Sequence, residues 1–250
     1  MARIKKVQHG ERVDLTGHLD ELRTRVLVSV AAFGVALGLC FWQNHLVLSI
    51  VNLPLAGKEL ITLSPTEPFT TTLTLSMYAG ILLALPVVLY QAYAFILPAF
   101  NRSEKKVALP LMLMSPVLFV AGAAFAYFVV VPAALRFLLH FNADQFSTQL
   151  RAKEYYSFLS LTMIGCGVVF QVPVGVLGLT RLGITDAAGL RAKRRYAWLG
   201  CAVVAAALPG VDPVTMLFEM VPLVALYELS ILLASAFGVS SLGEPDASVT

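Results

Sequence analysis

Two glutamates near the ends of apolar stretches are the residues best suited to bind a charged ligand. Glu21 lies in the segment His18-Leu19-Asp20-Glu21-Leu22-Arg23, just before the first apolar stretch, and Glu104 follows Ser103 just before the third. A carboxylate accepts two parallel hydrogen bonds from a guanidinium group. If both glutamates lie on one face of the molecule, they could therefore receive two guanidinium groups.

Both glutamates also have an ordinary structural interpretation. Glu21 could interact with the positive end of a helix dipole and pair with Arg25, four residues later on the same helix face. Glu104 would lie in the first turn of a helix capped by Ser103, where acidic residues are common. The two interpretations stay open for each glutamate.

The charged residues lie almost entirely between the apolar stretches of the chain. Uncharged runs extend between Arg25 and Lys58, Glu67 and Arg102, Lys106 and Arg136, and Glu154 and Arg181. Each run is long enough to cross the hydrocarbon core of a bilayer, which takes roughly 20 helical residues. With 58% apolar and 13% charged residues, and a mean hydropathy of +0.79, the chain is typical of an integral membrane protein. Nothing in the charge distribution suggests binding to nucleic acid.

The apolar pattern predicts an all-α, polytopic membrane protein with six transmembrane helices. The predicted spans are Val26–Trp42, Leu73–Ile96, Val107–Val131, Phe158–Thr180, Tyr196–Leu208 and Val214–Leu233. The last two are expected to be short, because the uncharged run 196–211 holds only sixteen residues, which rise about 24 Å in a helix. The turn-forming sequence 208–213 separates these two spans. We expect residues 1–25 to be an N-terminal segment with an interfacial helix, 26–236 the transmembrane domain, and 237–250 a polar, disordered tail.

The basic residues orient these spans across the membrane. Fourteen Lys and Arg residues lie in segments 1–25, 97–106 and 181–195, which six spans place on one side. The opposite side has four, namely Lys58, Arg136, Arg151 and Lys153. Since basic residues concentrate in cytoplasmic loops, both termini and both candidate glutamates are predicted to be cytoplasmic.

Prolines have two expected effects. On the outer side, the sequence Ser64-Pro65-Thr66-Glu67-Pro68-Phe69 predicts a rigid loop, because proline fixes φ and keeps the preceding residue out of the helical conformation. Within the spans, Pro86, Pro116 and Pro173 should bend their helices and favour a concave bundle. Proline is also common in membrane helices without such an effect.

Two acidic residues interrupt the last predicted span. Glu219 is expected near its outer end, where the side chain could reach water. Glu228 is expected deeper, where it would need a hydrogen-bond donor.

The motifs around the candidate residues resemble those of the TatC family, the multispanning signal-receptor subunit of the twin-arginine protein translocase. The matching patterns are His-Leu-x-Glu-Leu-Arg at 18–23, Ser-Pro-x-Glu-Pro-Phe at 64–69, Ala-Tyr-Phe-Val-Val-Val-Pro at 126–132, Gly-Ile-Thr at 183–185 and Leu-Tyr-Glu at 226–228. The resemblance covers roughly residues 15–236.

This resemblance implies a function in the export of folded proteins. In the family, the cytoplasmic face binds the paired arginines of a signal peptide, and the matching acidic positions are Glu21 and Glu104, with His18 and Arg23 in the same motif. The resemblance also implies single-span TatA- or TatB-type partners, further copies of the chain, contact with lipid, and a place in the bacterial cytoplasmic membrane. Translocation would use the proton-motive force, and neither a cofactor, a metal nor an enzymatic activity is implied.

One position departs from the family pattern. The family usually has a glutamate after phenylalanine in the fourth span, whereas this chain has Gln171, which keeps hydrogen bonding but loses the titratable charge. Polar contact with a partner helix remains open there. The candidates for such intramembrane or partner-docking contacts are Gln171, Asp212, Met216, Glu219 and Glu228.

The alternative function is secondary transport of a small solute. In that case Gln171, Glu219 and Glu228 would form a polar pathway near the bilayer midplane. The chain shows no internal repeat, however, and its candidate charged residues concentrate at the cytoplasmic rim. Nucleotide-binding, hydrolase and zinc-protease motifs are absent from the sequence, and Cys40, Cys166 and Cys201 have no metal-ligand or redox spacing.

Overall fold

Helices make up almost all of the described structure. The computed structural model describes residues 15–55, 57–96, 102–145, 148–181, 184–210 and 212–237, but not the side chains of 15–17, 102–108, 111, 181 and 236–237. The helices are α1 (Leu15–Trp42), α2 (Asn44–Asn52), α3 (Glu67–Ile96), α4 (Arg102–Phe125), α5 (Val131–His140), α6 (Ala152–Val169), α7 (Val172–Arg181), α8 (Ala187–Ala192), α9 (Arg194–Ala207) and α10 (Pro213–Phe237). Two short strands, β1 (Leu60–Ile61) and β2 (Leu150–Arg151), pair in parallel. The predicted all-α class is confirmed.

Within the described residues, five helical stretches are long and apolar enough to cross a membrane. They are His18–Trp42, Glu67–Ile96, Met112–His140, Ala152–Thr180 and Pro213–Ser235. The remaining predicted span corresponds to α9, whose 14 residues rise only about 21 Å. The six-helix arrangement with a short α9 is therefore confirmed. The expectation of a short last helix is corrected, because α10 has 25 residues.

The first helix begins earlier than expected. α1 runs without a break over 28 residues, so the predicted interfacial helix and the first span form one helix. Residues 1–14 and 238–250 lie outside the described part of the chain. The division into N-terminal segment, transmembrane domain and tail therefore stays a prediction.

Prolines shape the third and fourth spans. The third continues from α4 through a π-helical segment, Ala126–Val130, into α5, where Pro132 occupies the first turn and needs no hydrogen-bonded N–H. The fourth is broken at Phe170 and Gln171, so that Pro173 falls in the first turn of α7. The expected bend at Pro173 is therefore a break between two helices.

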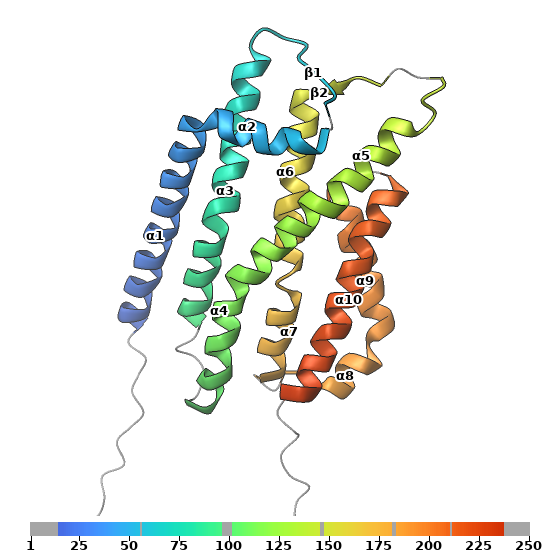
Figure 1. Ribbon diagram of the computed structural model, residues 1–250. Helices are drawn as coiled ribbons and strands as arrows, with labels where there is room; N and C mark the ends of the chain where they lie inside the picture. Colours follow the sequence, from blue (N-terminus) through green and yellow to red (C-terminus); the bar gives the residue numbers. More distant parts are fainter. Residues whose placement is uncertain are drawn as a thin grey trace, which may run out of the picture.

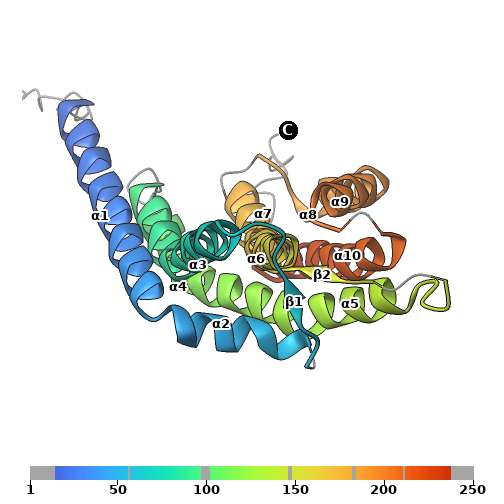
Figure 2. The same ribbon diagram turned by 90° about the horizontal axis from the view of Figure 1, so that it is seen from above.

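The helices form a bent row. Figure 2 shows α1 at one edge of this row and α9 at the other, with α4 and α5 crossing between them. The start of α1, the end of α10 and α8 all lie at the lower end of the bundle in Figure 1. We call this the lower end, and the opposite one, where α2 and the two strands lie, the upper end.

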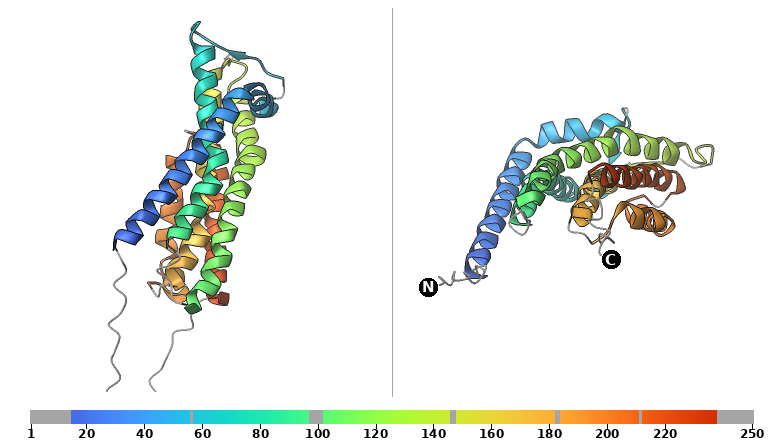
Figure 3. Two further views of the ribbon diagram at one scale, coloured as in Figure 1. Left: turned by 90° about the vertical axis from the view of Figure 1, so that its left-hand side faces the viewer. Right: turned by 90° about the horizontal axis from the view of Figure 1, so that it is seen from below.

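A short transverse helix lies against the bundle near its upper end. α2 runs across the side of the bundle, and α3 and α6 extend above it (Figures 1 and 3). Its carbonyl groups accept hydrogen bonds from tyrosines of the bundle. Tyr155 donates to the carbonyl of Val51 at 2.5 Å, and Tyr127 donates to that of Ile50 at 2.6 Å. These bonds fix α2 to the core.

Glycines allow α4 and α6 to pack closely. A Cβ atom added at Gly122 would lie 2.6 Å from the carbonyl oxygen of Cys166, and one at Gly167 would lie 2.5 Å from the ring of Phe119. Small residues commonly allow such close approach between membrane helices. This contact joins the third span, at α4, to the fourth span, at α6.

Candidate functional site

The lower end contains the first candidate glutamate, already in an ion pair. The Arg25 guanidinium donates to Oε1 of Glu21 from both Nε, at 3.0 Å, and Nη2, at 2.5 Å. Its Nη1 donates to Oε1 of Gln91 on α3, at 3.0 Å. The predicted pairing four residues along the helix therefore exists, and it is extended to a second helix. The Glu21 side chain remains 35% exposed, so a ligand could still reach it.

An aromatic contact fixes the start of α1 against the end of α3. The rings of His18 and Phe95 stack with centroids 4.3 Å apart and an interplanar angle of 14°. Arg23, from the same motif, is exposed. His18 and Glu21 thus lie on the side of α1 that contacts α3, where both are held before any ligand arrives.

The second candidate glutamate is described only by its backbone. Glu104 lies in the first turn of α4, as expected, but its side chain is outside the described residues. The helix begins at Arg102, one residue before Ser103, so the predicted cap at Ser103 is corrected to a position inside the first turn. The start of α4 lies beside the end of α3 at the lower end (Figure 1).

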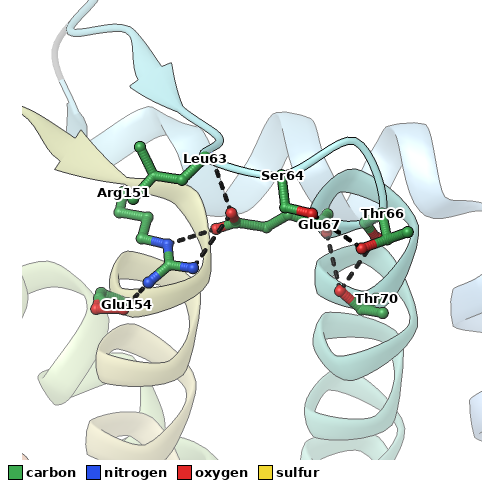
Figure 4. Close-up of polar contacts among 7 residues, drawn as sticks. All are labelled: Leu63, Ser64, Thr66, Glu67, Thr70, Arg151 and Glu154. Carbon is green, nitrogen blue, oxygen red and sulfur yellow. Dashed lines mark hydrogen bonds and ion pairs between the residues drawn. The ribbon is translucent and has the colours of Figure 1, made fainter.

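The proline-containing loop at the upper end, residues 64–69, is built around a buried glutamate. Glu67, only 4% exposed in the first turn of α3, accepts hydrogen bonds from the backbone N–H of Leu63 and from Nε of Arg151, both at 2.8 Å (Figure 4). A third bond comes from Nη2 of Arg151, whose Nη1 also donates to Glu154. The bonds to Glu67 raise the pKa of the Arg151 guanidinium above its ordinary value.

This arrangement gives the expected structured loop. The backbone N–H of Glu67 donates to the carbonyl of Ser64 at 3.1 Å, which closes the turn that contains Pro65. Pro68 and Phe69 follow in the first turn of α3, and the Phe69 side chain is 65% exposed. The Glu67–Arg151 pair joins the loop to the strand β2, so the two outer segments form one unit at the upper end.

Gln171 links the break in the fourth span to α4. Its Oε1 accepts a 2.6 Å hydrogen bond from the hydroxyl of Ser115, and its Nε2 donates to the Ser115 carbonyl at 3.1 Å. Ser115 is fully buried. The amide therefore holds together two spans at a point where the backbone of one is interrupted.

Asp212 has a local structural role. Its carboxylate accepts hydrogen bonds from the backbone N–H and the hydroxyl of Thr215. With Pro213 as the first residue of α10, this is the arrangement of a helix N-cap. Met216, one residue beyond Thr215, is half-buried on the same helix.

The two acids of α10 lie in different surroundings, and only Glu228 matches the expectation. Glu219 is fully buried, and within the described structure neither of its oxygens has a hydrogen-bond partner. The expectation that it reaches water is therefore wrong. Glu228 does have the predicted donor, because Arg194 at the start of α9 donates to its Oε2. The burial of each acid is set by the helix face it occupies.

One cavity of the bundle is apolar, and the described residues contain no candidate metal site. A cavity of about 420 Å³ lies below α2, between α1, α3 and the π-helical segment, and its lining includes Cys40, Leu75 and Tyr127. Such a space suits an apolar chain rather than a charged ligand. Among the described side chains, no group of three His, Cys, Asp or Glu residues is placed to hold a metal ion.

The chain was compared with known families, sequences and structures. The family model described as "Sec-independent protein translocase protein (TatC)" matches residues 17–222. The chain belongs to the TatC family. The TatC protein of Helicobacter pylori strain J99 is 38% identical over 223 residues, which covers 88% of each chain. That of Aquifex aeolicus is 38% identical over 225 residues, covering 88% of this chain and 93% of the relative.

Solved structures of TatC agree with the fold. A crystal structure of the twin arginine translocase receptor TatC in DDM superposes with a TM-score of 0.77 at 37% identity, covering 87% of this chain and 99% of the other. TatC membership confirms the predicted function in Sec-independent protein translocation. Together with the apolar helices, it also confirms a multi-pass membrane protein.

Several residues of these sites were not found from the sequence. Gln91, Ser115, Arg151 and Arg194 each bind a predicted site residue that lies far away in the chain. The Glu21–Arg25 pair, by contrast, has a local signal, the spacing of four residues on one helix. Long-range partners of this kind leave no periodic pattern in a single sequence.

Proposed function

We propose that the lower end of the bundle is the cytoplasmic receptor surface for twin-arginine signal peptides. The observation that carries this proposal is the fixed carboxylate of Glu21. Arg25 binds it only through Oε1 and is itself held by Gln91 on α3. Among the described side chains, none donates to Oε2, and that oxygen is available to an arginine of the peptide.

Glu104 is the proposed receptor for the second arginine. Its backbone lies in the first turn of α4, beside the end of α3, so both glutamates belong to neighbouring helix ends at one rim. The positive end of a helix dipole favours an ionised acid in that turn. His18 and Arg23 complete the proposed motif: His18 orients α1 through its stack on Phe95, and Arg23 is exposed to the peptide.

The test is peptide binding to the purified full chain. Glu21→Gln and Glu104→Gln should each weaken binding of a twin-arginine peptide about tenfold to a hundredfold, since each removes a charge-assisted pair worth roughly 1.5–3 kcal/mol. A twin-lysine version of the peptide should be much less affected. Asp20→Asn is the matched control, because Asp20 is an exposed acid next to Glu21 in α1.

Two outcomes would contradict this proposal. Unchanged binding of the twin-arginine peptide to both glutamine variants would show that Glu21 and Glu104 do not form the binding site. Equal losses for the arginine and lysine peptides would indicate a damaged structure instead, and a melting curve of each variant would show it.

The side formed by α9 and α10 is proposed to bind single-span TatA- or TatB-type subunits. A hollow of about 320 Å³ lies between α10 and the end of α4 with the π-helical segment, and it is lined only by apolar residues, namely Phe125, Val129, Leu217, Phe218, Val221 and Pro222. The short α9 also requires a locally thinner bilayer. Photocrosslinkers at Met216 and Ala225 should capture such a subunit, whereas one at Val120, exposed on α4, should capture lipid. The reverse pattern would place the docking side elsewhere.

The complete proposal places the protein in the bacterial cytoplasmic membrane with both termini cytoplasmic. It would work with further copies of itself and use the proton-motive force. The transporter alternative loses its support from the geometry, since its three pathway residues have separate surroundings. Gln171 binds Ser115, Glu228 binds Arg194, and Glu219 is enclosed.

A further inference from the structure

Glu219 is an enclosed acid in the interior of the bundle. None of its surface is exposed, and no donor among the described residues lies within hydrogen-bonding distance of either carboxyl oxygen. The other acid of α10, Glu228, receives Arg194 at Oε2. Glu228 thus has a guanidinium donor that stabilises a negative charge, and Glu219 has no such donor among the described residues.

The helix face explains this enclosure. Glu219 belongs to a stripe of buried residues on α10 that also contains Thr215, Leu223, Tyr227 and Ile231. Their regular spacing of four residues places them on one side of the helix. α10 packs against α7, α9, α5 and the π-helical segment. Because Glu219 is fully buried, its carboxyl group lies between helices and not toward lipid.

The groups that face Glu219 cannot balance a charge. The titratable groups close enough to act on it are the Cys166 thiol of α6 and the Asp212 carboxylate at the start of α10. Asp212 is itself an acid, and its oxygens are occupied by Thr215. The described basic side chains of the elements around α10 are all exposed, namely Arg136, His140, Arg191, Lys193, Arg194 and Arg195.

A carboxylate in such a place is much less stable than a carboxylic acid. Removing an ion from water without a compensating donor costs far more than removing a neutral polar group. The neutral acid also keeps a hydrogen that it can donate to a backbone carbonyl after a small rotation. The closed bundle therefore favours the form of Glu219 that carries a proton.

We propose that Glu219 is a proton-binding site of the α9–α10 hairpin, neutral in the closed bundle and able to ionise only when α10 moves away from the helices packed against it. In that step the O–H bond breaks, the carboxylate keeps the electron pair, and the proton passes to water. Asp212 lies seven residues earlier, about 10 Å along the helix toward the upper end. Proton exchange is thus expected with the upper aqueous side.

The experiment is infrared spectroscopy of the full chain in lipid nanodiscs between pH 5 and 9. The wild type should show a carboxylic-acid C=O band at pH 7, and Glu219→Gln should lack it. Glu228→Gln is the matched control: it is the same substitution on the same helix, at an acid that is paired with Arg194, and the band should remain. If Glu219→Gln does not fold, Glu219→Met replaces the acid with an apolar side chain of similar volume.

A second measurement uses the melting temperature. If the folded protein retains a proton on Glu219 that the unfolded chain releases, the wild type loses stability relative to Glu219→Gln as the pH rises from 5 to 8. The proposal is overturned if the acid band at pH 7 survives the Glu219 substitutions. It is also overturned if the difference in melting temperature between the two proteins is the same at every pH.

Discussion

Replacing Gly122 with alanine should destabilise the bundle even though alanine is the better helix former. In a helix interior this replacement is ordinarily favourable by about 0.5–1 kcal/mol. Here the new Cβ would lie 2.6 Å from the carbonyl oxygen of Cys166 and 2.9 Å from Cα of Gly167. Both are backbone atoms of α6, so relief requires α4 and α6 to separate. Overpacking of this kind costs about 1–3 kcal/mol, which leaves a net loss of up to about 2.5 kcal/mol.

The matched control is Gly38→Ala on α1. A Cβ at Gly38 would have no neighbour within 4 Å, so only the gain in helix propensity applies. Thermal unfolding of the purified full chain in one detergent should show Gly122→Ala melting below the wild type and Gly38→Ala at or above it. Shifts of the same sign and size for the two variants would refute the argument, because they would show that close packing of α4 on α6 does not limit stability.

Three further predictions follow from the polar contacts and the orientation. Asp212→Ala should lower the free energy of unfolding by about 0.5–2 kcal/mol through loss of the α10 cap, whereas Asp212→Asn should lose less; equal losses in thermal unfolding would argue against a capping role. Gln171→Leu should cost about 1–3 kcal/mol because it leaves the buried Ser115 hydroxyl without its acceptor, and Ser115→Ala in the same background should recover part of that loss, which a double-mutant cycle measures. In intact cells, a cysteine at Ala188 should be shielded from an impermeant thiol reagent and one at Thr66 should be labelled; the opposite labelling would invert the orientation.

The transmembrane helices could be predicted from the sequence because one physical requirement determines them. A helix must be apolar over roughly 20 residues to cross the hydrocarbon core, and the uncharged runs of this chain meet that requirement. The predicted ends of the spans were less accurate. The structure has α3 beginning at Glu67 and α5 ending at His140, both beyond the predicted spans. Helices continue past the membrane wherever capping and packing allow, which hydropathy does not report.

The transverse helix α2 shows a different limit of prediction from the sequence. Its residues, Asn44–Asn52, are apolar enough to seem part of the first span, yet they turn across the upper end. The contacts that hold them come from Tyr127 and Tyr155, about 80 and 100 residues later in the chain. The Glu67–Arg151 pair has the same character, since its two residues are 84 positions apart. The sequence indicated a rigid outer loop through its prolines, but not the arginine that holds it.

The two acids of α10 show most clearly what a single sequence leaves undetermined. Glu219 and Glu228 are nine residues apart, which is two and a half helical turns, so they must point to opposite faces of the helix. That much follows from spacing alone. Which face is inward does not, because α10 is apolar around its whole circumference and its hydrophobic pattern prefers no side. Packing inside the bundle encloses Glu219 on one face, and the start of α9 brings Arg194 to Glu228 on the other. Depth in the membrane, on which the expectation for Glu219 was based, therefore has less effect on an intramembrane acid than the helices that surround it.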